Sequence, residues 1–338
     1  MTSPSPTVYR EHPVFFAGGD GKISGVLTIP TRRPVVCDAA AILLAGGGEV
    51  QGGERNRMWV HLARRLAESG IPALRFDYRG VGESEGVVSE WWLDNPFTED
   101  LIGAVRWLQN QGMRRLAMAG TCFGARTILA AAEQIDDLAG VALFTTPLSS
   151  ARLGEKAATR FADHWTLADY LRRALTLRVL RRALDPRWRE AYRRVFAVKT
   201  RRLRQSVRVT AERNPVKELR WVSPVYLGPV VRLARRRLPT LMFYGAGEEE
   251  YQDLSAAREA GLGRVIEESK GAIEVRTAPG VIHGYTTLDA QRITVETALA
   301  WITSCLAPEF LPAAEWAASA TESATEQAGR PRESRAGG

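Results

Sequence analysis

The chain has 338 residues, of which 45% are hydrophobic and 25% are charged, a composition typical of a folded globular protein. It contains no run of roughly 18 apolar residues, as a membrane span needs, and residues 1–6 lack the beginning of a signal peptide. The three cysteines, Cys37, Cys122 and Cys305, are far apart and odd in number, which argues against a disulfide framework or a cysteine-based metal site. We therefore expect a cytoplasmic protein with free thiols that uses no metal and no other cofactor.

The positive charge is concentrated in one part of the chain. The net charge is +8, yet residues 151–237 alone hold 24 Lys and Arg against 7 Asp and Glu, and the remainder carries a net charge of −9. A charge concentrated in one region bears on what that region binds. We consider a solvated arginine-rich helical surface, docking of an acidic acyl carrier protein or of the phosphates of coenzyme A, and nucleic-acid binding. No nucleic-acid-binding motif supports the third interpretation.

Strands and helices alternate through the first half of the chain. Short apolar runs predict buried strands, and the loose alternation on both sides of residues 18–21 predicts an antiparallel hairpin. Apolar residues at helical spacing, such as Met58, Leu62 and Leu66, predict the intervening helices. The predicted strands are 8–17, 22–30, 39–45, 71–76 and 115–119, and the predicted helices are 57–70 and 97–111.

The second half resumes this alternation after a long interruption. Residues 150–237 show arginine-rich helical patterns with interspersed Trp and Tyr, and such a length is uncommon for a structureless loop. Residues 307–338 are rich in Ala, Ser, Glu and Gly and show no periodicity, which predicts a disordered tail. The predicted strands are 138–145, 239–245 and 272–277, and the predicted helices after the elbow helix are 255–268 and 287–306.

This order of elements predicts an α/β fold with a mostly parallel sheet and helices on both faces. The core would consist of residues 8–149 and 238–306. Residues 150–237 would form a basic helical cap, inserted between the sixth and seventh strands. We expect this cap above the carboxyl ends of the strands, where open α/β sheets bind their ligands.

Residues 116–127 combine a strand pattern, a tight turn and a helix pattern. The turn reads Gly-x-Cys-x-Gly, with Cys122 between Gly120 and Gly124. This layout is typical of a nucleophile elbow, in which a sharp strand-to-helix turn exposes one reactive side chain above a sheet. Glycines flank such a turn because a Cβ would clash with the neighbouring backbone. The alternative is that Cys122 is a small apolar filler at a tight turn.

A thiol nucleophile needs a base and a group that orients the base. Of the four histidines, only His283 follows a late strand in a glycine-flanked loop, whereas those at positions 12, 61 and 164 lie in the hairpin, a helix and the cap. The acid should come from the loop after the preceding strand. That loop contains three consecutive glutamates, at positions 248, 249 and 250, so the sequence alone leaves the acid open.

The order of nucleophile, acid and histidine resembles that of the α/β-hydrolase superfamily. Residues 77–84 are similar to the Asp-x-Arg-Gly-x-Gly-x-Ser loop of that superfamily, in which we expect a structural turn network. Residues 47–80 resemble the exosortase-system-associated branch of serine-aminopeptidase-like hydrolases. Members of that branch can carry Cys in the elbow, as dienelactone hydrolases do. The resemblance is specific over residues 46–132 and around His283.

The resemblance implies a role for each matching residue. Cys122 would be the nucleophile and His283 the general base, and Glu248 takes the usual position of the acid, with Glu249 as the second choice. The chain departs from the family pattern in having Cys for Ser and Glu for Asp. Thiolates attack esters and thioesters readily, whereas amide cleavage needs a protonated leaving amine, so the Cys weakens a peptidase interpretation.

The resemblance also implies an oxyanion hole formed by backbone N–H groups. One donor would be Phe123, directly after the nucleophile, and the other would come from residues 47–49, with Gly48 as the central candidate. The common His-Gly of this loop is absent from the sequence.

Three functions are compatible with these residues. The first is hydrolysis or transfer of an acyl group from an ester or thioester through a covalent acyl-enzyme, as in a thioesterase, cyclase or acyltransferase of a biosynthetic pathway. The second is a non-catalytic member of the fold whose basic cap binds an anionic partner. The third is lactone hydrolysis of the dienelactone type, which shares the triad.

Overall fold

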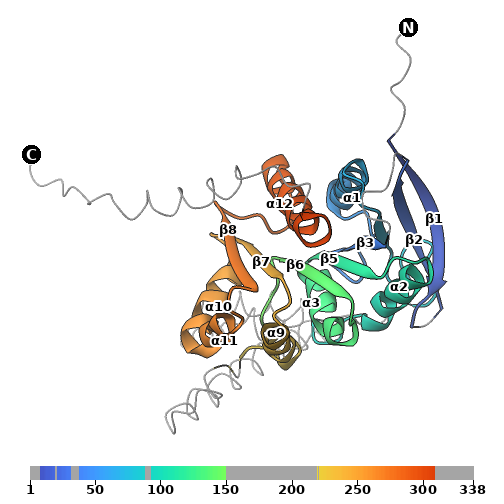
Figure 1. Ribbon diagram of the computed structural model, residues 1–338. Helices are drawn as coiled ribbons and strands as arrows, with labels where there is room; N and C mark the ends of the chain where they lie inside the picture. Colours follow the sequence, from blue (N-terminus) through green and yellow to red (C-terminus); the bar gives the residue numbers. More distant parts are fainter. Residues whose placement is uncertain are drawn as a thin grey trace, which may run out of the picture.

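A computed structural model of the chain describes residues 8–19, 21–31, 38–87, 93–149, 219 and 221–308. Within these ranges, eight strands form one sheet with helices on both faces (Figure 1). The strands are β1 (Tyr9–Ala17), β2 (Lys22–Pro30), β3 (Ala39–Leu44), β4 (Ala73–Phe76), β5 (Arg115–Thr121), β6 (Leu138–Phe144), β7 (Thr240–Gly245) and β8 (Ile273–Ala278). The helices are α1 (Met58–Glu68), α2 (Thr98–Asn110), α3 (Cys122–Ala131), α9 (Pro224–Arg236), α10 (Glu249–Ala257), α11 (Gly263–Glu268) and α12 (Leu288–Leu306), with the short turns η1 (Arg55–Arg57), η2 (Ala132–Gln134) and η3 (Arg258–Leu262).

The strand order of the sheet is β1-β2-β4-β3-β5-β6-β7-β8. Strand β2 is antiparallel to both of its neighbours, β1 and β4. All the other neighbouring strands, from β4 through β3 and β5 to β8, pair in parallel. Strand β3 lies beside β5; the chain leaves β3 toward β4 and leaves β5 toward β6, which are opposite directions along the sheet. Ligands of open α/β sheets bind at such a switch point, outside the carboxyl ends of the strands. These pairings confirm the predicted α/β-hydrolase architecture.

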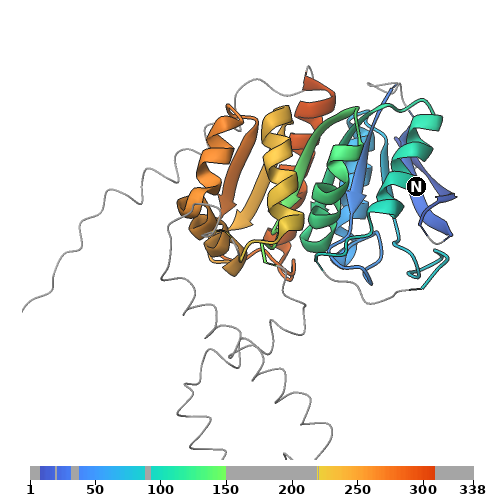
Figure 2. The same cartoon turned by 90° about the horizontal axis from the view of Figure 1, so that it is seen from below.

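Two apolar clusters hold the helices against the sheet. On one face, Leu62 of α1 and Trp301 of α12 pack on the alanine-rich surface of the central strands. On the opposite face, Leu101 of α2, Ile128 of α3 and Val230 of α9 belong to the larger cluster. Figure 2 shows α2, α3 and α9 side by side over this face. Both faces of the central strands β3, β5, β6 and β7 are therefore buried, as their largely apolar sequences predict.

Helix α9 belongs to the core, although residues 224–236 fall within the predicted cap of residues 150–237. Tyr226 and Leu233 are buried in the same cluster as the residues of α3. The arginines at the end of the helix suggested a solvated segment, yet Arg236 donates hydrogen bonds to backbone carbonyls that follow α3. Residues 224–236 therefore pack with the core, and the cap itself stays a prediction. Its residues 150–218 and 220, and residues 309–338 of the predicted tail, lie outside the described residues.

Within the described ranges, none of the helices combines the length and the apolar character of a membrane span. The longest of them, α12, has 19 residues and carries charged side chains at Asp289, Arg292 and Glu296. Its apolar side faces the sheet, as the burial of Ala298 and Ile302 shows.

We expect truncation of a buried α9 side chain to destabilise the whole domain. Leu233→Ala should lower the free energy of unfolding by about 2–5 kcal/mol, because it removes methyl groups from a packed core, and denaturation should remain one transition. Urea unfolding followed by far-ultraviolet circular dichroism measures this change. The matched control is Arg235→Ala, which truncates an exposed side chain of the same helix. An equal effect of both variants, or a separate transition for α9, would contradict its place in the core.

Candidate active site

The turn from β5 into α3 has the geometry of a nucleophile elbow. Cys122 has a φ of 43°, a positive value that residues with a Cβ rarely adopt. A Cβ on Gly120 would lie 2.7 Å from the carbonyl carbon of Gly124, and a Cβ on Gly124 would lie 2.6 Å from the carbonyl oxygen of Ala45. Both distances are too short for a side chain. The two glycines thus allow α3 to begin directly against the end of β3, which leaves Cys122 at the carboxyl edge of the sheet.

The loop after β8 brings His283 to the same edge. The imidazole forms a hydrogen bond with the side chain of Cys122, and its Nδ1 lies 3.4 Å from Oε1 of Glu250. The backbone of this loop is held by another carboxylate, because Oε1 of Glu248 accepts hydrogen bonds from the N–H groups of Ile282 at 2.8 Å and His283 at 2.5 Å. The predicted nucleophile and base are therefore neighbours in space.

The carboxylate that faces the imidazole differs from the one that the sequence favoured. The resemblance predicts Glu248 as the acid and Glu249 as the second choice, and the sequence pattern places both in a loop before a helix that starts at residue 255. Helix α10 instead begins at Glu249, and Glu248 precedes it with extended backbone. Glu248 therefore turns toward the backbone of the histidine loop, and Glu250, buried in the first helical turn, faces the ring. The helix dipole favours acidic residues at this position.

The charge state of His283 follows from its neighbours. Partial burial disfavours the charged imidazole, but the hydrogen bonds to Cys122 and Glu250 and the charges of both groups outweigh burial and raise the pKa of His283 to about 10. The imidazole is therefore protonated at neutral pH.

A pocket of about 370 Å³ opens beside the sulfur of Cys122. The pocket is also lined by Glu54 and Arg55, for which the sequence predicts no role, together with Cys122 and His283. The one signal for them was the glycine-rich stretch that precedes them, which indicates a close backbone approach. The lining residues are Gly46, Val50, Gln51, Glu54, Arg55, Cys122, His283, Gly284 and Tyr285.

Glu54 connects the loop after β3 to the nucleophile elbow. Its Oε2 accepts hydrogen bonds from the N–H of Gly46 at 2.6 Å and from the hydroxyl of Thr121 at 2.8 Å, and its Oε1 accepts from the N–H of Arg55 at 3.0 Å. Hydrogen bonds to a charged acceptor are shorter and stronger than neutral ones. The carboxylate therefore fixes the distance between the two backbone segments on either side of the nucleophile.

The predicted donors of the oxyanion hole occupy different surroundings. The N–H of Phe123 lies directly after the nucleophile and donates to the carbonyl of Gly46 at 3.2 Å. Gly48 is buried and is absent from the pocket lining, where the loop presents Gly46, Val50 and Gln51 instead. Phe123 is absent from that lining too, so both donors stay predictions.

The loop at residues 77–84 forms a structural network away from the sulfur. Arg79 pairs with the fully buried Asp100 at 2.8 Å, and Ser84 donates its hydroxyl to the carbonyl of Asp77 at 2.8 Å. The carboxylate of Asp77 accepts a hydrogen bond from the N–H of Gly52 at 2.6 Å. Burial raises the pKa of Asp77, although this hydrogen bond acts in the opposite direction. These contacts agree with the turn network expected from the sequence.

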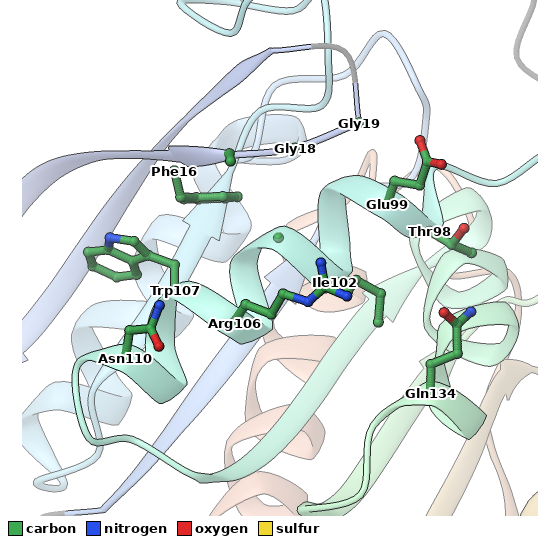
Figure 3. A pocket seen from close by; sticks show the side chains of 12 residues that line it. Phe16, Gly18, Gly19, Thr98, Glu99, Ile102, Arg106, Trp107, Asn110 and Gln134 are labelled. Carbon is green, nitrogen blue, oxygen red and sulfur yellow. The ribbon is translucent and has the colours of Figure 1, made fainter.

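A second pocket, of about 610 Å³, lies between the hairpin and helix α2 (Figure 3). Phe16 and Trp107 form an aromatic pair on one side, with ring centroids 6.2 Å apart, and Arg106 and Asn110 lie on the same helix. No cysteine or histidine lines this pocket. In the described part of the chain, no group of three or more His, Cys, Asp and Glu side chains could hold a metal ion. The pocket beside Cys122 is therefore the candidate active site.

The elbow glycines provide one test of this geometry. Gly124→Ala should destabilise the fold by about 1–3 kcal/mol, because the new Cβ meets backbone oxygens that cannot move aside. Gly228→Ala is the matched control, since Gly228 lies inside α9 without a backbone clash, and it should stabilise the helix by about 0.5–1 kcal/mol. Chemical denaturation of both variants measures the two changes. Effects of the same sign would contradict the close approach at the elbow.

The titration of His283 provides a second test. Its pKa of about 10 lies above the ordinary value of 6.5. The interaction of His283 with Cys122 and Glu250 therefore stabilises the fold fully below pH 6.5, and this contribution disappears as the pH rises through about 10. Glu250→Gln should lower this pKa, because it removes a charge beside the ring. Glu249→Gln, a substitution at an exposed neighbour, should leave it unchanged. Nuclear magnetic resonance of the ring protons measures both values, and an equal shift in the two variants would refute the Glu250 contact.

Two bacterial proteins share part of the sequence. The uncharacterized protein YfhR of Salmonella typhi is 33% identical over 128 residues, which are 37% of this chain and 42% of that protein. The uncharacterized 31.7 kDa protein in the traX-finO intergenic region of Escherichia coli is 33% identical over 85 residues, 24% of this chain and 29% of that protein. The chain thus matches less than half of the length of these relatives.

Solved structures share the fold at low sequence identity. The α/β hydrolase GrgF from Penicillium sp. sh18 is 19% identical, with a TM-score of 0.53 and coverage of 88% of this chain and 99% of that one. The Pyrococcus furiosus esterase Pf2001 is 14% identical, with a TM-score of 0.52 and coverage of 90% and 96%. The Pyrobaculum calidifontis esterase is 16% identical, with a TM-score of 0.51 and coverage of 88% and 87%. These likenesses support the fold.

A family model extends over more than half of the chain. Residues 39–249 match the family described as serine aminopeptidase, S33. The match begins at β3, includes the nucleophile elbow and ends at the start of α10. The finer resemblance to the exosortase-associated branch stays a prediction. The chain therefore belongs to the serine aminopeptidase S33 family of the α/β-hydrolase superfamily.

Proposed function

We propose that this protein is a cysteine-dependent hydrolase or acyltransferase that acts on an ester or thioester through a covalent acyl-enzyme. The observation that carries the proposal is the contact between Cys122, on the strained elbow, and His283, whose ring faces Glu250. A nucleophile, a base and an orienting group in hydrogen-bonding order are the signature of nucleophilic catalysis. In this scheme Glu250 is the acid of the triad, and Glu248 is a positioning residue for the histidine loop.

The reaction has two balanced halves. In the first, the Cys122 thiolate forms a bond to the carbonyl carbon of the substrate. The bond between this carbon and the leaving alkoxide or thiolate then breaks, and His283 gives its proton to the leaving group. In the second, water or another hydroxyl or amine attacks the acyl-enzyme, His283 takes the proton of the attacking group, and the bond to sulfur breaks. The products are a free acid or a transferred acyl group, and the thiolate–imidazolium pair is restored.

The negative charge on the carbonyl oxygen needs a donor during both halves. The N–H of Phe123 is the first candidate, because it lies beside Cys122 at the start of α3. It donates to the carbonyl of Gly46, so the substrate oxygen would replace that carbonyl. The second donor would come from the loop after β3, and Gly48 stays a prediction for this role.

The thiol nucleophile supports esters and thioesters as substrates in preference to amides. Alkoxide and thiolate groups leave more readily than an unprotonated amine, so a thiol ester intermediate forms more easily from these substrates. The basic sequence of residues 151–237, with a net charge of +17, supports an acyl group delivered on coenzyme A or on an acidic carrier protein. The acyl donor would in that case be a thioester of a biosynthetic pathway.

A second candidate is the hydrolysis of a small lactone by the same residues. The observation that favours it is the modest pocket of about 370 Å³, whose lining includes the polar side chains of Gln51, Glu54 and Arg55. A lactone would open to an acyl-enzyme that keeps its own alcohol. The two candidates therefore differ in the mass of the intermediate, because only the lactone adds its full mass to the protein.

Intact-mass spectrometry with a panel of acyl-thioesters, esters, lactones and amides tests the proposal. We expect an acyl adduct that peptide mapping places on Cys122 and that disappears when substrate is exhausted. Cys122→Ala should abolish the adduct and reduce turnover by at least about a thousandfold, because the nucleophile is lost. Cys305→Ala should leave both unchanged, since this half-buried cysteine lies outside the pocket.

Retained turnover in Cys122→Ala would refute the proposal. An adduct confined to Cys37 or Cys305 would refute the assignment of the nucleophile. Absence of both adduct and turnover, together with salt-sensitive binding of an acidic carrier protein, would instead favour a non-catalytic member of the fold. Turnover of the amides alone would restore the peptidase interpretation that the family name carries.

A further inference from the structure

The turn at residues 54–57 combines unusual backbone geometry with a place in the active-site pocket. Glu54, with φ 59° and ψ 171°, has a conformation that is nearly confined to glycine, and Asn56 and Arg57 also have positive φ values, 54° and 60°. Such conformations are costly and persist only where the surrounding structure fixes them. Arg55 lies within this turn and lines the pocket with Cys122.

Hydrogen bonds fix the turn to both catalytic loops. The carboxylate of Glu54 binds the N–H of Gly46 and the hydroxyl of Thr121, the residue directly before the nucleophile. The side-chain amide of Asn56 donates to the carbonyl of Tyr285 at 3.4 Å, in the loop that carries the catalytic histidine. Arg55 stands between these two anchors, so its backbone has a defined position relative to the reacting sulfur.

The charges around the pocket leave one cation available for a ligand. Besides Cys122 and Tyr285, its ionisable lining residues are Glu54, Arg55 and His283. Glu54 already accepts three hydrogen bonds, and the imidazole of His283 faces Cys122 and Glu250. Arg55 is exposed, and its guanidinium makes no salt bridge with any carboxylate in the described ranges.

We propose that Arg55 forms an anion-binding subsite of the active site, so that the preferred substrate carries a carboxylate near the carbonyl group that reacts. The guanidinium presents a planar fork that binds a carboxylate through two parallel hydrogen bonds. The inference rests on the proposed function, because it names the class of substrate for that site. The carboxylate of the substrate would supply the acidic partner that Arg55 lacks in the described part of the chain.

Two alkylating reagents of similar size test the subsite without any turnover. Iodoacetate carries a carboxylate beside its reactive carbon, and iodoacetamide carries a neutral amide in its place. We expect Arg55→Gln to lower the ratio of the iodoacetate to the iodoacetamide rate constant at Cys122 by about tenfold, the effect of one charge-assisted contact. The rate with iodoacetamide should stay within about twofold of the wild type, because the nucleophile is untouched.

Arg57→Gln is the matched control for this measurement. It removes the same charge from the same turn, yet Arg57 does not line the pocket. An unchanged ratio in Arg55→Gln, or an equal fall in both variants, would overturn the proposal. The first result would mean a solvated arginine, and the second would mean a general effect of net charge.

Failure of the proposed function gives a different result. If neither reagent modifies Cys122, the nucleophile assignment fails, and calorimetry then decides the subsite by comparing succinate with succinamide. We expect succinate to bind the wild type and the Arg57→Gln variant more tightly than succinamide, and this preference to disappear in Arg55→Gln. Equal binding of the two compounds by the wild type would overturn the proposal.

Discussion

The close approach of backbone at the nucleophile elbow is the constraint on which the site depends. Helix α3 begins against the last carbonyls of β3, and this is possible only because Gly120 and Gly124 have no Cβ. The same crowding accompanies the positive φ of Cys122, which lies on the lining of the pocket. The apolar clusters on both faces of the sheet supply the free energy that holds this strained turn in place.

Two glutamates from one short segment serve His283 in different ways. Glu248, which is 2% exposed, accepts N–H groups and thereby fixes the backbone of the histidine loop. Glu250 faces the ring and favours its charged form. Burial of an ionised group is costly unless a partner and hydrogen bonds compensate for it. One carboxylate thus holds the backbone of the histidine loop, and the other acts on the charge of its ring.

In the proposed mechanism, a cysteine at the position of the family's serine changes the chemistry more than the fold. The elbow, the histidine loop and the switch point between β3 and β5 are all present with a cysteine at this position. The loop after β3 carries charge into the pocket through Glu54 and Arg55, which belong to a turn separate from the elbow. If the proposed function holds, substrate selection can vary on this loop while Cys122 and His283 stay in place.

The amino-acid sequence is enough to predict the fold class and the succession of strands and helices in the core, because periodic apolar residues and glycine spacing are local signals. The pairing of Cys122 with His283 is predicted by the order of nucleophile, acid and histidine along the chain, which resembles that of the α/β hydrolases. Tertiary structure decided that α9 belongs to the core, that Glu250 faces the imidazole and that Glu54 and Arg55 line the pocket. Each of these depends on contacts between distant segments or on the residue at which a helix begins, because a shift of a few residues at the start of α10 decides which carboxylate points at the ring.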